Sequence, residues 1–292
     1  MNILTFDIEE WFIEKAFDGA RKEKFEEFDL YLEKILNLLE VTSTKATFFC
    51  VGKMATDFPN IIKKIAEQGY EIGCHSNVHT WLNKMTYEDA LQDTREAVDS
   101  LQQCVGKKVL SYRAPAFSIG EKNKWAFDIL AECGIERDAS IFPAAREFGG
   151  FPSFGYKEPV LISHNGVNIK EFPICTTKLM GKELAYSGGG YFRFFPLWFI
   201  EKEIKKSTYS MCYFHIGDLI SETRSLMTKE EYELKFKEKG TLINRLKRHV
   251  KINFGNKKSF SKLTKLIKNH QFVCLDEIDK QIDWTSCKQI TI

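Results

Sequence analysis

Two histidines, His75 and His79, stand four residues apart just after an apolar stretch, and this spacing suits a metal site. If the segment turns helical, residues i and i+4 face the same side and both imidazoles can reach one ion. The acidic run 7–10 adds carboxylates, because alternate residues of a strand share a face and bring Asp7 and Glu9 together. Two such carboxylates repel each other unless a cation lies between them. Two histidines and one carboxylate are the ligands of many hydrolytic zinc sites and non-haem iron sites, which keep positions open for water and substrate.

Three further residues fall at the ends of predicted strands, where α/β folds build their active sites. Arg113 opens the run Arg113-Ala114-Pro115-Ala116-Phe117, and arginine can hold a carboxylate through two hydrogen bonds. Asp138 lies near the end of the next strand. His215 ends an apolar strand, and such neighbours lower the pKa of a histidine whereas a nearby acid raises it. Taken singly, each of these features also fits a structural role: a surface loop, or a hydrogen-bonded core residue.

Short apolar strands alternate with amphipathic helices along most of the chain. The pattern predicts strands at 3–6, 46–51, 70–74, 109–112, 135–139, 169–174 and 210–215. It predicts helices at 22–40, 86–104, 122–133 and 196–206, and another from Pro59 to the residue before Gly69. This alternation indicates a parallel α/β fold, either a barrel or an open sheet. Residues 140–168 interrupt the rhythm and are predicted to form a long surface loop.

Composition excludes several classes of protein. The 292 residues are 43% hydrophobic and 28% charged, with a formal net charge of +2, which is too balanced for a protein whose whole surface grips nucleic acid. Eight cysteines without a CxxC pair predict reduced, mostly buried thiols. Neither a secretory signal nor an apolar run of membrane-spanning length is visible, so we expect a cytoplasmic protein.

The segment 241–270 carries nine basic residues and no acidic one. We expect either peripheral contact with an anionic membrane through this segment or a solvated basic helix face. Binding to nucleic acid is not expected, because only Phe254 and Phe260 are interleaved as stacking residues. The glycines at 188–190 permit close approach of the backbone to a sugar or phosphate, or form a plain flexible turn.

In chain order, these motifs resemble those of the polysaccharide deacetylase family, also called carbohydrate esterase family four or the NodB-homology domain. The matching positions are Thr5-Phe6-Asp7, residues 75–79, residues 113–117, Asp138 and His215. A narrower resemblance, to bacterial members of exopolysaccharide and surface-glycan gene clusters, rests on Glu171-Phe172-Pro173, residues 187–193 and Arg248-His249. It implies an α/β fold: a distorted (β/α)7 barrel over residues 1–220, with a basic helical C-terminal extension, 221–292, packed on it.

The resemblance also implies roles for single residues. Asp7 would be the general base and His215 the general acid, with Arg113 orienting Asp7 and Asp138 supporting the acid. His75 and His79 would bind a divalent metal, most often zinc. The family usually has two adjacent aspartates where this chain has Asp7-Ile8-Glu9-Glu10, so the third ligand is either Glu9, favoured by strand parity, or Glu10. Substrate contacts are expected at four positions: Pro115, Phe117, Tyr191 and Arg193.

The expected function is metal-dependent removal of an N-acetyl group from an amino sugar. The substrate would be a bacterial surface polysaccharide or its lipid- or nucleotide-linked precursor. In the precursor, the amino sugar would be attached to an anionic carrier. Two alternatives stay open: a deformylase or cyclic-amide hydrolase of the same superfamily, and a metal-free glycan-binding homologue without catalysis.

Overall fold

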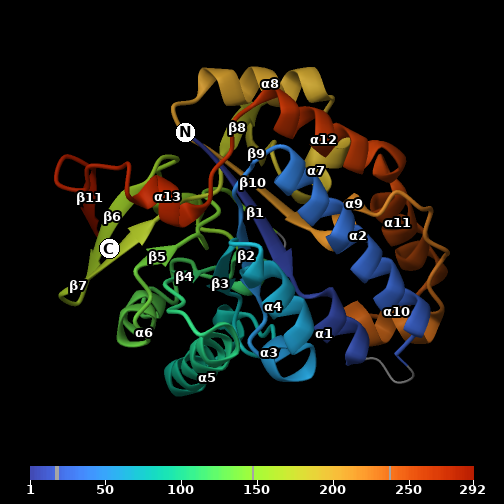
Figure 1. Cartoon of the computed structure of the whole chain (residues 1–292), viewed down its shortest axis with the longest axis horizontal. Coiled ribbons are helices and arrows are strands. Elements are labelled where there is room, and N and C mark those ends of the chain that lie inside the picture. Colours follow the sequence, from blue (N-terminus) through green and yellow to red (C-terminus); the bar gives the residue numbers. More distant parts are fainter. Residues whose placement is uncertain (17–19, 147, 237) are drawn as a thin grey trace.

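A mostly parallel sheet forms the centre of the molecule (Figure 1). The computed structural model describes residues 1–16, 20–146, 148–236 and 238–292. The strands of the main sheet are β1 (Asn2–Ile8), β2 (Thr47–Cys50), β3 (Glu71–Cys74), β4 (Ser111–Tyr112), β5 (Arg137–Asp138), β6 (Val160–His164), β7 (Val167–Glu171), β10 (Ser210–His215) and β11 (Gln289–Thr291). A separate hairpin consists of β8 (Thr176–Leu179) and β9 (Lys182–Ala185).

Among the described residues, the strands of the main sheet follow the order β10-β1-β2-β3-β4-β5-β7-β6-β11, and the first seven are parallel. Contacts other than strand pairing link the segment that follows β7 to β10 and to the residue before β10. The backbone N–H of Met211 lies 3.0 Å from Cys175 Sγ, and the Tyr209 hydroxyl donates to the carbonyl of Pro173 at 2.9 Å. The α/β class is therefore confirmed, with seven parallel strands arranged as a barrel that strand pairing leaves open.

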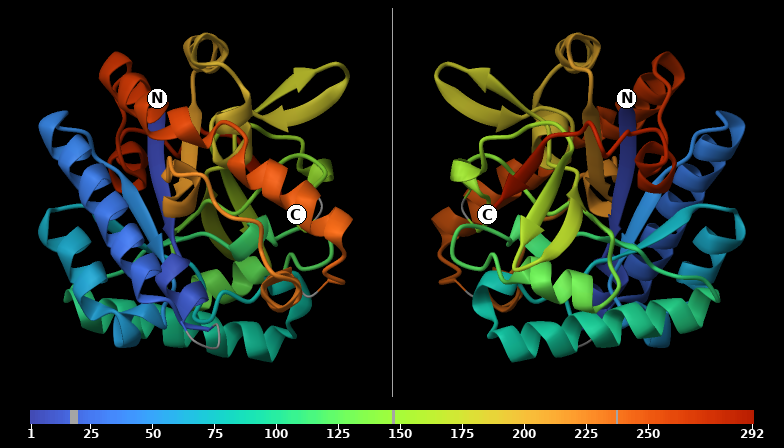
Figure 2. Two further views of the ribbon diagram at one scale, coloured as in Figure 1. Left: turned by 90° about the vertical axis from the view of Figure 1, so that its right-hand side faces the viewer. Right: turned by 90° about the vertical axis from the view of Figure 1, so that its left-hand side faces the viewer.

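Helices cover the outside of the sheet (Figure 2). They are α1 (Glu10–Lys15), α2 (Lys22–Val41), α3 (Met54–Asp57), α4 (Pro59–Glu67), α5 (Tyr87–Val105), α6 (Ala126–Glu132), α7 (Gly189–Phe194), α8 (Leu197–Lys206), α9 (Ile216–Leu219), α10 (Lys229–Phe236), α11 (Leu242–Asn253), α12 (Ser259–Asn269) and α13 (Leu275–Asp279). Local signals set their ends. The Thr86 hydroxyl accepts from the N–H of Asp89 and so caps α5, and Gly106 at φ 68° ends it.

Phenylalanines from three adjacent strands fill the core beneath the helices. Phe6 of β1 lies between Phe48 of β2 and Phe214 of β10, with ring centroids 5.0 and 6.0 Å away. All three side chains are buried. The strands read as apolar runs because the parallel sheet is covered on both faces.

The prediction that residues 140–168 form one long surface loop is wrong. Strand β6 lies within this range, and Phe142, Phe151 and Phe154 are buried. Asn165 and Gly166 connect β6 to β7 with φ of 45° and 84°, the conformation that an Asn-Gly hairpin turn requires. Asn-Gly between two apolar runs was the signal for this hairpin. The β8–β9 hairpin, which turns at Met180-Gly181, was not predicted either.

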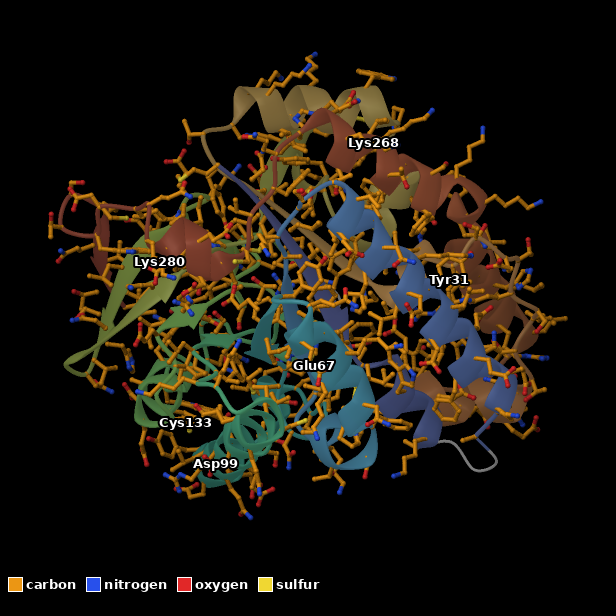
Figure 3. The ribbon with its side chains drawn as sticks, viewed as in Figure 1. Tyr31, Glu67, Asp99, Cys133, Lys268 and Lys280 are labelled. Atoms are coloured by element: carbon orange, nitrogen blue, oxygen red, sulfur yellow. The ribbon has the colours of Figure 1, made fainter. Side chains whose placement is uncertain are left out.

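The segment after residue 220 covers α2 and also joins the sheet. Tyr31 of α2, labelled in Figure 3, donates to Glu222 at 2.7 Å and accepts from the N–H of Ser221 at 2.8 Å. Val273 exchanges backbone hydrogen bonds with β1, and β11 pairs with β6. The tail is thus helical for most of its length and adds a strand that was not expected. The domain boundary at residue 220 stays a prediction.

In the described part of the chain, no helix has both the length and the hydropathy that crossing a bilayer requires.

Candidate active site and metal centre

Glu9, His75 and His79 converge at the carboxyl ends of β1 and β3. Glu9 Oε2 lies 2.5 Å from His79 Nε2 and 3.5 Å from His75 Nε2. One ligand atom from each residue fits within 4.8 Å of the other two. Since these are two imidazoles and a carboxylate, the set suits a divalent ion such as zinc and leaves further positions open.

The two histidines meet without the helical turn that their spacing suggested. Ser76 and His79 adopt left-handed backbone conformations, with φ of 58° and 56°. The carboxylate of Asp93, on α5, accepts from the N–H groups of Asn77 and Val78 at 2.8 and 3.3 Å and so fixes this irregular turn. The imidazole rings end up 5.2 Å apart between centroids. The i, i+4 spacing therefore identified the histidine pair, but the helical turn that was expected to bring the two rings together does not form.

His75 is oriented by the strand next to its own. Its Nδ1 lies 2.7 Å from the backbone carbonyl of Arg113, which only accepts, so Nδ1 carries the proton. The other ring nitrogen, Nε2, is thereby directed at Glu9. A carbonyl behind a ligating histidine is a common support in metal sites, because it fixes the tautomer and the ring orientation.

The side chains of Glu9 and Glu10 contact different groups. Burial would raise the pKa of Glu9, but attraction by His79 and His215 outweighs it and holds this pKa well below the usual value. Glu10 accepts from the N–H of Gly217 at 2.6 Å, away from the histidine pair. Burial, and then the charge of Glu9, raises the pKa of Glu10 to about 7. Of the two candidates for the third ligand, the structure brings Glu9 to the histidines.

Asp7 and Arg113 form a buried ion pair beside the cluster. Arg113 Nη1 donates to Asp7 Oδ1 and to the Thr5 hydroxyl, both at 2.8 Å. Both charged side chains are almost fully buried. The guanidinium also lies 4.3 Å from the ring centroid of Phe49, on β2. The pair fixes one carboxylate oxygen of Asp7, and the other, Oδ2, lies 3.8 Å from His215 Nε2.

His215 lies beside Asp7 because β1 and β10 pair with these two residues in register. Its Nε2 is also 3.8 Å from Glu9 Oε1, and its Nδ1 is 2.9 Å from Asp218 Oδ2. Burial lowers the pKa of His215, but Glu9, Asp218 and Asp7 together raise it well above its ordinary value. The ring therefore tends to hold a proton near neutral pH, which suits a general acid.

The sequence analysis missed Asp218. This residue stands third in α9, which begins directly after β10, and its carboxylate bonds to both the backbone N–H and the ring of His215. An acid three residues after a strand-ending histidine was the available signal. Asp218 is thus a carboxylate in direct contact with His215, and the supporting role expected of Asp138 stays a prediction.

Asp138 is paired elsewhere. It lies opposite Glu171 in the β5–β7 register, and both carboxyls are buried. The Ser140 hydroxyl donates to Asp138 and accepts from the N–H of Ala114, which follows Arg113. Burial raises the pKa of both carboxyls, and that of Glu171 rises well above its ordinary value because Asp138 adds to the effect. Asp138 therefore supports the loop after β4.

Two of the expected substrate contacts, Pro115 and Phe117, are buried in that loop. Ala116 and Phe117 both have positive φ, at 55° and 54°, and the Phe117 ring packs on Tyr213 at 5.1 Å. Gly188 has no room for a side chain, because a Cβ there would lie 2.2 Å from the Tyr213 ring. The glycine run thus accommodates Tyr213.

The other two expected contacts, Tyr191 and Arg193, lie on α7. Both are partly buried. Arg193 is 3.6 Å from Asp218 and donates to the carbonyl of Ile252 at 3.1 Å. Its connection to His215 is therefore indirect: Arg193 contacts Asp218, and Asp218 contacts His215. Substrate binding by all four residues stays a prediction.

Two family models cover most of the chain without overlapping. A model described as polysaccharide deacetylase matches residues 3–137, and one described as a domain of unknown function (DUF3473) matches residues 139–280. Residues 3–137 belong to the polysaccharide deacetylase family. This deacetylase segment holds Asp7, Arg113 and the candidate metal ligands, whereas His215 and Asp218 lie in the range of the second model.

Curated relatives match part of this chain. A peptidoglycan-N-acetylglucosamine deacetylase of Bacillus cereus is 35% identical over 97 residues, which are 33% of this chain and 35% of the relative. An uncharacterized protein of Bacillus subtilis is 34% identical over 102 residues, which are 35% of this chain and 31% of the relative. The chain thus matches about a third of the length of these proteins.

Solved structures show that the deacetylase fold is shared more widely than one activity. A structure described as a "putative polysaccharide deacetylase" of Mycobacterium smegmatis has a TM-score of 0.63 at 15% identity, covering 100% of this chain and 92% of that one. A 4-alpha-glucanotransferase of Thermococcus litoralis has a TM-score of 0.58 at 13% identity, covering 100% of this chain and 42% of that one. Because the two are described with different activities, the side chains of the site must decide the chemistry.

Zinc should raise the melting temperature of the wild-type chain but not that of the His75→Ala/His79→Ala variant. An ion that binds only the folded site stabilises it by about 2.7 kcal/mol when its free concentration is 100 times Kd. Differential scanning fluorimetry after chelator treatment measures the shift. His164→Ala, which removes an imidazole paired with Asp128 on β6 and α6, is the control and should keep the shift. An equal shift in the double variant would contradict the ligand assignment.

Glu171→Gln should make stability less sensitive to pH. The Asp138–Glu171 pair has raised pKa values, so folding takes up a proton, and the wild type loses stability as pH rises above the ordinary carboxyl range. The loss is about 1.4 kcal/mol per pH unit while the folded chain holds one more proton than the unfolded chain. Urea unfolding at a series of pH values should show a flatter profile for the variant. Glu136→Gln, at an exposed position, is the control. Parallel profiles for Glu171→Gln and wild type would refute proton uptake by this pair on folding.

Proposed function

We propose that this protein is a metal-dependent hydrolase that removes the N-acetyl group from an amino sugar. The observation that carries the proposal is the position of His215 Nε2, which lies 3.8 Å from both Asp7 Oδ2 and Glu9 Oε1. A base, an acid and a metal site thus meet at one edge of the sheet. The names of the curated relatives, which include peptidoglycan and chitooligosaccharide deacetylases, support the same chemistry.

Zinc is the proposed ion, held by Glu9, His75 and His79. The donor set matches catalytic zinc sites, and the carbonyl of Arg113 behind His75 provides the expected support. When bound, the ion supplies Lewis acidity that polarises the acetamide carbonyl and lowers the pKa of water.

Asp7 acts as the general base. Arg113 holds one of its carboxylate oxygens in place, so the other is available to accept a proton from water as the water oxygen bonds to the acetyl carbon. Because the ion pair is buried, Asp7 is oriented before substrate arrives and needs no rearrangement.

His215 acts as the general acid. As the carbon–nitrogen bond breaks, Nε2 donates its proton to the sugar nitrogen, which would otherwise leave as a strongly basic anion. Asp218 holds Nδ1 and stabilises the charged ring until that moment. The products are a free amino sugar and acetic acid, which releases its proton to solvent and becomes acetate. The proton on Asp7 then returns to His215 through solvent, so both residues regain their starting protonation states.

The proposed substrate is a bacterial surface polysaccharide or its lipid- or nucleotide-linked precursor. Nine basic residues between 241 and 270, with no acidic one, support an anionic carrier. Positive charge near the site attracts a phosphate-bearing substrate and raises its association rate.

Asp7→Asn should lower turnover by about a hundredfold or more while zinc stays bound, because the base is lost and the ligands are kept. Acetate release from an N-acetylated oligosaccharide, with formate measured in parallel, reports the activity and the acyl group. Elemental analysis reports the metal. Loss of the buried charge costs about 3 kcal/mol of stability, so a melting curve must accompany the assay. Asp99→Asn, on the exposed face of α5 (Figure 3), is the control; full activity in Asp7→Asn removes Asp7 from this role.

Asp218→Asn should move the basic limb of the kcat/KM profile to lower pH. Asp218 raises the pKa of His215, so without its charge the ring loses the catalytic proton at a lower pH. Asp218→Glu should restore much of the wild-type profile, because it returns the charge. An unchanged basic limb in Asp218→Asn, with zinc retained, would show that Asp218 does not support His215.

A further inference from the structure

Helix α11 turns its apolar side to solvent. Its most exposed apolar side chains are Leu242 (55%), Ile243 (64%), Leu246 (44%), Val250 (62%) and Phe254 (53%), the last being the residue that follows the helix. At 100° per residue these positions fall within an arc of about 120°. No residue of α11 is buried.

The polar side of the same helix faces the protein. Arg245 donates to the carbonyl of Met227 at 3.1 Å. The guanidinium of Arg248 lies 4.1 Å from the ring centroid of Phe236, on α10. This orientation is the reverse of an ordinary surface helix, which buries its apolar side. Figure 2 (left) shows α11 on the outside of the molecule.

An aromatic residue from another segment extends the apolar surface. Phe194, at the end of α7, is 63% exposed and lies 5.8 Å from Phe254 between ring centroids. The surface is therefore formed by two segments far apart in the sequence. We call these six side chains, the five around α11 and Phe194, the apolar face.

Basic side chains border this face. Lys247 and Lys251 are exposed and follow the apolar arc around the helix, and Lys257 and Lys258 come shortly after it. Three acidic side chains of the preceding segment have partners: Glu231 pairs with Arg21, Glu233 accepts from the N–H of Gly240, and Glu238 accepts from the Tyr232 hydroxyl. An exposed apolar arc flanked by lysines is the pattern of a helix that lies in a membrane interface.

We propose that the apolar face docks on the surface of an anionic lipid bilayer. Its leucine, valine, isoleucine and phenylalanine side chains enter the boundary between headgroups and acyl chains, while the lysines reach the lipid phosphates. The adjoining positive charge favours this occupant over a second copy of the chain, whose matching lysines would repel it.

The docked helix is close to the candidate general acid. The carbonyl of Ile252 accepts from Arg193, which also contacts Asp218, the partner of His215. A bilayer under α11 thus places the site near lipid headgroups, where an amino sugar carried on a lipid phosphate is held. This last step rests on the proposed function, whereas the docking itself does not.

Co-sedimentation with phosphatidylcholine vesicles, with and without phosphatidylglycerol, tests the docking. The wild-type chain should sediment with the anionic vesicles and stay in solution with the neutral ones. Leu246→Ser/Val250→Ser should lower the partition coefficient by roughly tenfold or more, because two apolar side chains no longer enter the interface. Lys247→Gln/Lys251→Gln should lower it by about fivefold per lysine, and this part should disappear at high salt.

Matched controls are available elsewhere on the surface. Val41→Ser, at an exposed valine that ends α2, and Lys107→Gln/Lys108→Gln, before β4, should sediment like the wild type. All of these positions are exposed, so circular dichroism should show unchanged folding.

Three results would overturn the docking: no sedimentation of the wild type with anionic vesicles, sedimentation of Leu246→Ser/Val250→Ser equal to wild type, or a dimer in size-exclusion chromatography that this variant breaks. Asp7→Asn should bind vesicles normally, and Leu246→Ser/Val250→Ser should still deacetylate a soluble oligosaccharide. Vesicle binding without any turnover by the wild type would refute the proposed function alone.

Discussion

The ion pair between Asp7 and Arg113 is the interaction around which the site is built. A guanidinium with no exposure to solvent is tolerable only if its charge and donors are met, and Asp7, Thr5 and the carbonyl of Ala139 meet them. Arg113 also contacts both the candidate base and one candidate metal ligand. The side chain of Arg113 holds the candidate base, and its carbonyl holds His75 toward Glu9. Because the buried guanidinium of Arg113 must have hydrogen-bond partners, residues from several strands are held in place around it.

Much of this arrangement was predictable, because it depends on short-range patterns. The strand 210–215 was predicted with its observed bounds, since an apolar run ending in a polar histidine defines both ends. Asp7, His75 and His79 were found because residue type and spacing suffice to name them. The turn that brings the histidines together was not predictable in this way, because Asp93, sixteen residues further along, sets it through hydrogen bonds. Likewise, only the pairing of β5 with β7 shows that Asp138 lies opposite Glu171.

The site is divided between two segments that family models treat separately. The deacetylase segment, 3–137, supplies the candidate base and metal ligands, and the segment 139–280 supplies the candidate acid with Asp218. The second segment also includes α11, so the residues that would donate the proton and those that would contact a membrane belong to one unit. Arg193, which contacts both Ile252 and Asp218, connects the proposed lipid-binding helix with the proposed proton donor.

The pairing of β1 with β10 affects how the chain folds during its synthesis. Asp7 and His215 are register partners although eight strands of the described chain, β2 to β9, lie between them in the sequence. During synthesis, Asp7 and His215 cannot come together until β10 has left the ribosome. One edge of β1 therefore stays unpaired for most of that time. Such long-range closure slows folding. The nascent chain is thus exposed to aggregation for longest at the strand that carries Asp7.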